Sequence, residues 1–71
     1  MYYLSEHEEI LNEELGNYNT YAISSFENQK LMGKIHDIST NKNFVDLIVQ
    51  KLNDSKVSYI HFDEVVSDLM F

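Results

Sequence analysis

The pattern in this chain that comes closest to chemistry is a histidine and two carboxylates near the C-terminus. The chain places His61, Glu64 and Asp68 at intervals of three and four residues, so a helix would carry all three on one face. An imidazole and carboxylates on one helix face are groups that a metal can use. Further ligands would have to come from histidines elsewhere, and nothing in the spacing requires that. We interpret the three residues as a solvated helix face and expect neither a metal nor a cofactor.

Catalysis would need an activated nucleophile or a paired acid and base. The suggestive residues are Ser24 and Ser25, together with His36 and Asp37. The two serines lie in a strand-like stretch without the sharp turn or the oxyanion loop that a nucleophile needs. The chain has only two glycines, too few for a phosphate-binding loop. We therefore expect that the protein is not an enzyme and has no catalytic residues.

Two amphipathic helices are predicted in the second half of the chain, over residues 40–53 and 59–70. Ser39 or Thr40 provides an N-cap oxygen for the first helix. Its predicted apolar face recurs at helical spacing and consists of Phe44, Val45, Leu47, Ile48, Val49 and Leu52.

The last helix has the most complete start signal. It begins after Ser58, and Val57 and Phe62 stand at the positions of a hydrophobic staple. Its apolar stripe matches helical spacing throughout and consists of Phe62, Val65, Val66, Leu69 and Met70. Asp68 and the terminal carboxylate oppose the helix dipole, so either packing of the stripe or a cation of a partner must offset them.

Strands are predicted before the helices. Residues 17–27 are rich in Tyr, Thr, Ile and Phe, which favours a strand. Residues 31–38 form a second strand with Leu31, Gly33 and Ile35 on one face at period two. A turn at residues 27–30 joins the two strands as an antiparallel hairpin.

The first fifteen residues are ambiguous. Ser5 and Glu8 form a capping-box pattern, and Gly16 stands where a helix C-cap would, which favours a helix. Tyr2 and Tyr3 favour extended structure, and a third strand would support a hairpin that is marginal alone. We expect a strand that begins near Tyr2 and leave its end open. The predicted fold class is α+β, with two or three antiparallel strands followed by two C-terminal helices packed on the sheet, in a single domain over residues 1–71.

The size and the start of the chain suggest an oligomeric state and a compartment. A chain of 71 residues buries about 60% of its unfolded surface, so its stability is thin and a homodimer is the default expectation. There is no cysteine, which excludes disulfides. The first residues lack the basic start and apolar run of a signal peptide. The expected location is the cytoplasm.

The acidic residues are concentrated in the first part of the chain. Residues 1–29 carry six acids and no Lys or Arg, whereas residues 30–71 carry six acids and five lysines. Such a field repels phosphates and anionic lipids, so we expect no direct nucleic-acid or membrane binding and a protein partner with a basic surface. The alternative is a solvated face that only keeps the protein soluble. The predicted partner-binding residues are Glu6, Glu8, Glu9, Glu13, Glu14, Tyr18, Tyr21, Glu64 and Asp68.

The tyrosines allow two interpretations. A chain with five Tyr and no Trp or Arg would have to use aromatic anchors at an interface. The alternative is that most tyrosines simply cover a small core.

Several short segments give the chain a family resemblance. They are Tyr2-Tyr3-Leu4, residues 18–23 (YNTYAI), Asp37-Ile38-Ser39-Thr40, Leu52-Asn53, Val57-Ser58 with His61, and Val65-Val66-Ser67-Asp68-Leu69. With them the chain resembles a family of short, uncharacterised acidic proteins of Gram-positive, often spore-forming, bacteria. The chain departs from the family pattern at Asn41 and Lys42, at Tyr59 and at Ser67, where an acid, a proline and a glutamate are usual. The resemblance implies no established activity.

The expected function is therefore binding. We expect a small acidic adaptor or regulator, in a specific form an inhibitor or accessory factor of a DNA-bound machine such as a sigma factor or a site-specific recombinase. The alternative is a structural, self-assembling homodimeric protein with no regulatory partner.

Overall fold

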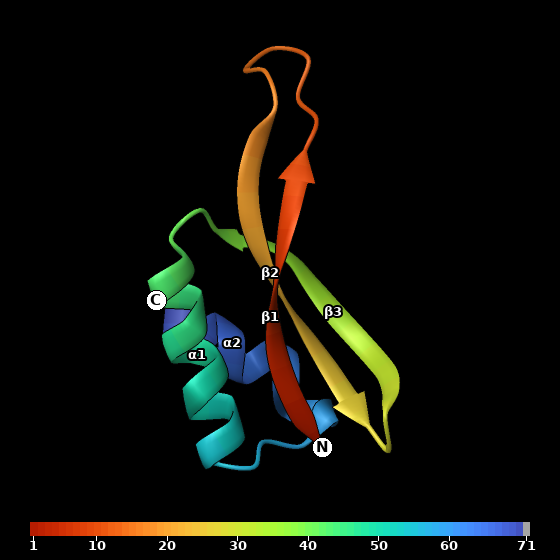
Figure 1. The fold of residues 1–71 in the computed structure, drawn as a ribbon. Helices are drawn as coiled ribbons and strands as arrows, with labels where there is room; N and C mark the ends of the chain where they lie inside the picture. The colour runs from red at the N-terminus through yellow and green to blue at the C-terminus, as the bar shows by residue number, and fades with distance from the viewer. Residues whose placement is uncertain (71) are drawn as a thin grey trace.

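The computed structural model describes residues 1–70 as three strands followed by helices (Figure 1). The elements are β1 (Tyr2–Ile10), β2 (Tyr18–Glu27), β3 (Lys30–Ser39), α1 (Lys42–Asp54), the 3₁₀ turn η1 (Tyr59–His61) and α2 (Phe62–Met70). The strands form one antiparallel sheet in the order β1-β2-β3. The predicted α+β fold with two C-terminal helices is confirmed. No helix in residues 1–70 is long and apolar enough to cross a membrane.

The ambiguous first segment is a strand. β1 pairs with β2 without interruption from Tyr2 opposite Phe26 to Ile10 opposite Tyr18. Tyr3 is 1% exposed on the face that meets the helices, and Ser5 on the same face donates a hydrogen bond to Asp46 of α1 (2.8 Å). Tertiary pairing thus overrides the local capping-box pattern, because a strand can bury Tyr3 and satisfy its backbone against β2.

The predicted face of β3 is wrong at its start. Gly33 lies opposite Ser25, but Leu31 lies opposite Phe26, so one extra residue is inserted in β3. A bulge of this kind reverses the side-chain alternation. Leu31 therefore does not share a face with Gly33 and Ile35, and it is 51% exposed.

The start and the apolar face of α1 also differ from the prediction. The N-cap is Asn41, whose side chain accepts a hydrogen bond from the N–H of Phe44; Ser39 instead accepts from the N–H of Asn41 (3.0 Å). β3 continues to Ser39, so the chain can turn only after it. The buried residues are Val45, Ile48 and Leu52, which leaves Leu47 at 57% exposure.

The last helix begins with a tighter turn than predicted. Ser58 precedes η1 but its side chain makes no capping hydrogen bond, and regular α-helix starts at Phe62. Phe62 and Val66 are buried, while Val65, Leu69 and Met70 pack at the margin of the core. The apolar stripe is thus as predicted, and its packing holds the helix.

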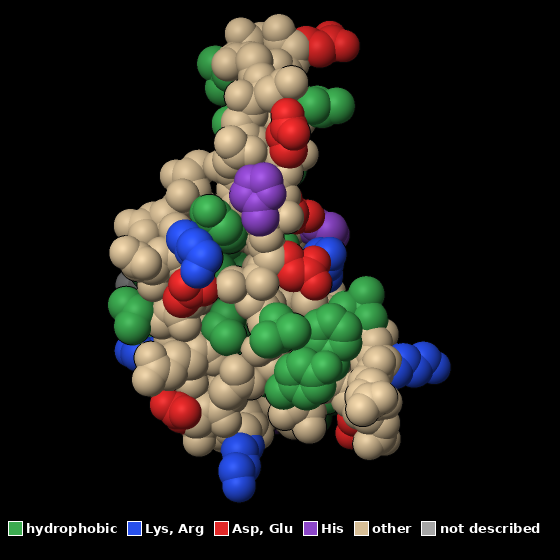
Figure 2. All heavy atoms as spheres, viewed as in Figure 1, with side chains coloured by type: hydrophobic (Ala, Val, Ile, Leu, Met, Phe, Trp, Pro, Cys, Tyr) green, Lys and Arg blue, Asp and Glu red, His purple; other side chains and the backbone are tan. Residues whose placement is uncertain are grey.

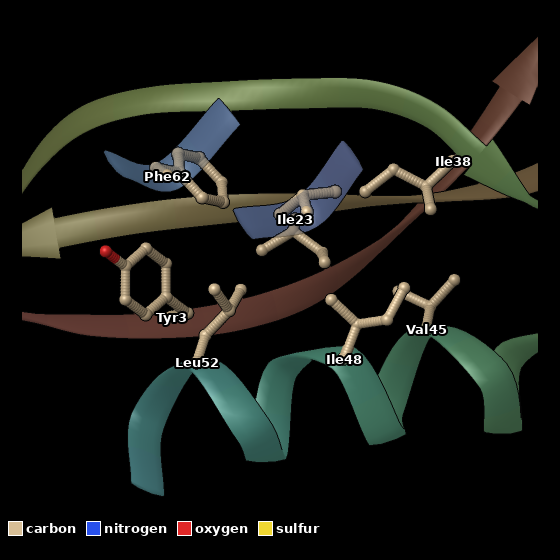
Figure 3. Close-up of a cluster of buried hydrophobic side chains, with 8 residues drawn as sticks. Tyr3, Ile23, Ile38, Val45, Ile48, Leu52 and Phe62 are labelled. Carbon is tan, nitrogen blue, oxygen red and sulfur yellow. The ribbon is translucent and has the colours of Figure 1, made fainter. Parts of the chain in front are cut away.

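One hydrophobic core joins the sheet to both helices (Figure 3). Side chains of α1 point toward the strands, where they meet Tyr3, Ile23 and Ile38. Tyr3 and Phe62 pack with ring centroids 4.9 Å apart, and the Tyr3 hydroxyl donates to the carbonyl of Val57 (2.5 Å). The first strand and the last helix are therefore fixed to each other through this aromatic pair.

Candidate protein-binding surface

The β1–β2 hairpin extends beyond the rest of the molecule. β2 is paired with β1 along its whole length, whereas its pairing with β3 runs only from Tyr21 to Glu27. The part of the hairpin beyond Tyr21 is consequently a two-stranded ribbon that projects away from both helices (Figure 1). We call residues 9–18 the hairpin tip.

The turn of the hairpin tip has a defined conformation. The side-chain oxygen of Asn12 accepts hydrogen bonds from the backbone N–H groups of Glu14 (2.9 Å) and Leu15 (2.8 Å). Gly16 has a φ of +79°, a left-handed conformation that glycine adopts without strain. Gly16, which stands where the alternative helix would have its C-cap, is thus a turn glycine. These contacts hold the turn of the tip in one shape.

The acids of the hairpin form two groups. Glu9, Glu13 and Glu14 are exposed, and the ion pairs found in residues 1–70 do not include them. Their charge is available to a partner. The other group, Glu6 and Glu8, is engaged within the fold.

Glu6 and Glu8 bind side chains of β3. Glu6 Oε2 lies 2.5 Å from Lys34 Nζ, and this hydrogen bond lowers the pKa of Glu6 below its usual value. Glu8 accepts from the N–H of Asp37 (3.1 Å) and lies 2.6 Å from His36 Nδ1. Burial acts to raise the pKa of Glu8, but the hydrogen bonds outweigh it and the pKa is lowered. These two acids stabilise the sheet and offer less charge to a partner.

Two predicted partner-binding residues, Tyr18 in the hairpin tip and Tyr21 at the start of the projecting ribbon, contact other parts of the fold. Tyr18 donates a hydrogen bond from its hydroxyl to Asp37 Oδ2 (2.8 Å), which raises the pKa of Tyr18. Tyr21 contacts His7 edge to face, with centroids 5.7 Å apart, and packs against the core. Both are half-buried, so they brace the ribbon on the body and leave part of each ring accessible.

The structure places Glu64 and Asp68 apart from the hairpin. Both are exposed on α2, which lies in the body of the molecule, away from the hairpin tip (Figure 1). Glu64 lies 3.7 Å from His61 Nδ1. Within residues 1–70 no three His, Asp or Glu side chains converge on a point where a metal could bind.

The two serines considered as nucleophiles are buried in β2. Adjacent residues of a strand face opposite sides of the sheet, so Ser24 and Ser25 cannot belong to one site. Ser25 donates to the carbonyl of Gly33 (3.1 Å), and His36 is engaged by Glu8. Within residues 1–70 no hydrogen bond joins either serine to a histidine.

An apolar patch covers the start of the sheet on the side away from α1. Tyr2 stacks on Phe26 with centroids 5.2 Å apart and an interplanar angle of 14°, and Leu4 and Leu31 are 48% and 51% exposed. Figure 2 shows a green cluster of hydrophobic side chains in this region, below the acidic ribbon. We call Tyr2, Leu4, Phe26 and Leu31 the apolar patch. It is contiguous and exposed, as interaction surfaces often are.

An open cleft of about 570 Å³ adjoins this patch. It is lined by Met1, Tyr2, Glu27, Asn53, Lys56, Val57 and Ser58. Its walls carry one acid and one base, so it does not extend the acidic surface of the hairpin. The main candidate surface is therefore the hairpin tip, with the apolar patch as a second one.

Sequence analysis identified the acids of the tip but missed its leucines. Leu11 and Leu15 are 77% and 82% exposed. Their approximate helical spacing with Leu4 and Ile10 favoured burial on a helix. The signal that could have identified them is the pair Asn12 and Gly16, which are both typical turn residues.

Comparisons with known proteins place the chain in a family but give no relative of known activity. Neither the curated proteins nor the solved structures contain a significant match. A family model matches residues 1–71, and its description is a family of unknown function, DUF6514. The expected resemblance to a family without established activity is confirmed over the whole chain. The chain belongs to this family of unknown function, DUF6514.

Proposed function

We propose that the protein is a non-enzymatic adaptor or regulator that binds a basic protein surface through its hairpin tip. One observation carries the proposal: Glu9, Glu13 and Glu14 are exposed and outside the ion pairs of residues 1–70, on a ribbon that projects from the body. A net charge of -7 steers such a surface toward a partner rich in Lys and Arg. Nucleic acids and anionic membranes carry the wrong charge for it.

The specific form of the proposal is a cytoplasmic factor that regulates a DNA-bound machine. Sigma factors and site-specific recombinases present basic surfaces to DNA, and an acidic ribbon competes for such surfaces. In a Gram-positive, spore-forming bacterium the regulated process would include sporulation. The support for this form is the charge of the ribbon alone.

An affinity pull-down of the tagged protein from native lysate tests the proposal. The binding step is run at low and at high salt, and bound proteins are identified by mass spectrometry. The Debye length falls from about 8 Å at 0.15 M salt to about 3 Å at 1 M. A stoichiometric basic partner that is lost at high salt supports a regulator. Recovery of the protein alone contradicts it.

A second candidate function is self-assembly into a homodimer. The apolar patch favours it, because Tyr2 and Leu4 are 42% and 48% exposed and small domains commonly gain stability by association. Sedimentation velocity of the wild type and of Leu4→Asp separates the two functions. A dimer that dissociates in the variant supports self-assembly, and a monomer at all concentrations excludes it.

A further inference from the structure

The hairpin tip carries exposed leucines as well as acids. Leu11 and Leu15 are nearly fully exposed, at 77% and 82%. Exposed leucines are ordinary when they are scattered over a body. These two stand four residues apart in a short turn at the end of the ribbon.

The turn presents the leucines in a fixed geometry. Asn12 accepts hydrogen bonds from the two consecutive N–H groups of Glu14 and Leu15. The backbone of Leu15 is thereby held before any partner arrives. A preorganised loop loses less conformational entropy on binding, and this favours affinity.

The surroundings of the leucines limit the chemistry of the partner. Figure 2 shows hydrophobic side chains on both sides of the tip, with acidic side chains next to them. Glu13 and Glu14 separate the two leucines in sequence, and Glu9 precedes them on β1. A flat surface could cover only one side of such a ribbon. A cleft with apolar walls and a basic rim would cover both sides and neutralise the acids.

We infer that the hairpin tip inserts Leu11 and Leu15 into an apolar cleft of a protein partner whose rim carries Lys or Arg. The inference rests on the proposed function, because it names the part of the hairpin that makes the contact. The acids guide association and the leucines provide the buried contact. The tip is the inserted element, and the partner provides the cleft.

Photo-crosslinking in the full chain tests the inference. The photoreactive amino acid p-benzoylphenylalanine replaces Leu11, Leu15 or Ile60 in cells of the source organism. Ile60 is the matched control because it is 84% exposed but lies on η1, away from the hairpin tip. The expected result is that positions 11 and 15 crosslink to one protein, at apolar peptides flanked by Lys or Arg, and that position 60 does not.

Affinity measurements with the purified partner complete the test. Leu11→Ser and Leu15→Ser are each expected to weaken binding at least about tenfold, as truncations of buried interface contacts do. Ile60→Ser should change the Kd less than about twofold. All three side chains are exposed, so far-UV circular dichroism should show the same folded state in each variant.

Other outcomes separate the inference from the proposed function. Crosslinking only from position 60, or equal affinity of the leucine variants and the wild type, overturns the leucine contact and leaves the regulator intact. Crosslinking of positions 11 and 15 to a second copy of this chain overturns both and supports self-assembly. An absence of crosslinks at all three positions overturns the leucine contact, and the salt-dependent pull-down then decides the proposed function independently.

Discussion

The side chain of Asn53, in the last turn of α1, closes the edge of β1 at Tyr3. Asn53 Oδ1 accepts a hydrogen bond from the N–H of Tyr3 (2.8 Å), and Asn53 Nδ2 donates to the carbonyl of Tyr3 (3.0 Å). The amide thus takes the place of a neighbouring strand. An open strand edge promotes unwanted pairing, so Asn53 both joins α1 to the sheet and protects the start of β1.

Asn53→Ala is expected to lower the free energy of unfolding by about 1–2 kcal/mol, because it leaves the N–H and the carbonyl of Tyr3 without partners. Asn53→Asp should be similarly costly, since a carboxylate accepts from the N–H but cannot donate to the carbonyl. Urea denaturation measures both. The control is Asn43→Ala at an exposed position of the same helix, which should change stability by less than about 0.5 kcal/mol. Equal effects at the two positions would contradict the role of Asn53.

Two leucines of α1 differ sharply in burial. Leu52 is 0% exposed and Leu47 is 57% exposed. Leu52→Ala should cost about 2–5 kcal/mol through lost burial and the cavity that remains, enough to unfold much of a small domain. Leu47→Ala should stay within about 0.5 kcal/mol. Thermal denaturation followed by circular dichroism distinguishes them, and a large loss for Leu47→Ala would mean that α1 uses the wider apolar face that the sequence suggests.

The ion pair of Glu6 and Lys34 makes a pH-dependent contribution to stability. The hydrogen bond from Lys34 lowers the pKa of Glu6 in the folded state. Its stabilisation is therefore present above the usual pKa of 4.5 and is lost as the pH falls through the lower folded value. Lys34→Met should destabilise the protein by less than about 1 kcal/mol at neutral pH. This difference from the wild type should shrink as the pH falls below the pKa of Glu6.

Urea titrations over a pH series measure that difference. The matched control is Lys51→Met, because Lys51 is exposed in the last turn of α1 and the ion pairs of residues 1–70 do not include it. Its difference from the wild type should be nearly constant over the same range. If the stability difference between Lys34→Met and the wild type is also independent of pH, the pKa of Glu6 does not depend on Lys34.

The sequence predicts the elements of this fold better than their faces. The stripe of α2 is correct because each apolar residue at helical spacing meets the core. The predicted apolar face of α1 is too wide, because it includes the exposed Leu47. Leu47 is as apolar as Leu52, and only the position of the sheet determines which of the two is buried. Leu31 lies on the opposite face of the sheet from the predicted one because of a bulge in β3. Bulges leave no clear pattern in a single sequence.

The sequence predicts the charge of the hairpin surface but not its shape. The acids of the first 29 residues predict an acidic surface, but their pairing depends on which strand lies beside them. β3 brings Lys34 to Glu6 and His36 to Glu8, while Glu9, Glu13 and Glu14 extend beyond it. The contact of Asn53 with Tyr3 joins residues 50 positions apart, and no local pattern in the sequence predicts it.

The most direct test of the central claim is a pull-down at low salt that compares two triple variants of equal charge. One carries Glu9→Gln, Glu13→Gln and Glu14→Gln at the hairpin tip. The other carries Glu27→Gln, Asp54→Asn and Asp63→Asn, at exposed positions elsewhere. We expect that recovery of the basic partner falls at least about tenfold for the tip variant and stays at the wild-type level for the other. Equal recovery with both variants would contradict binding through the hairpin tip.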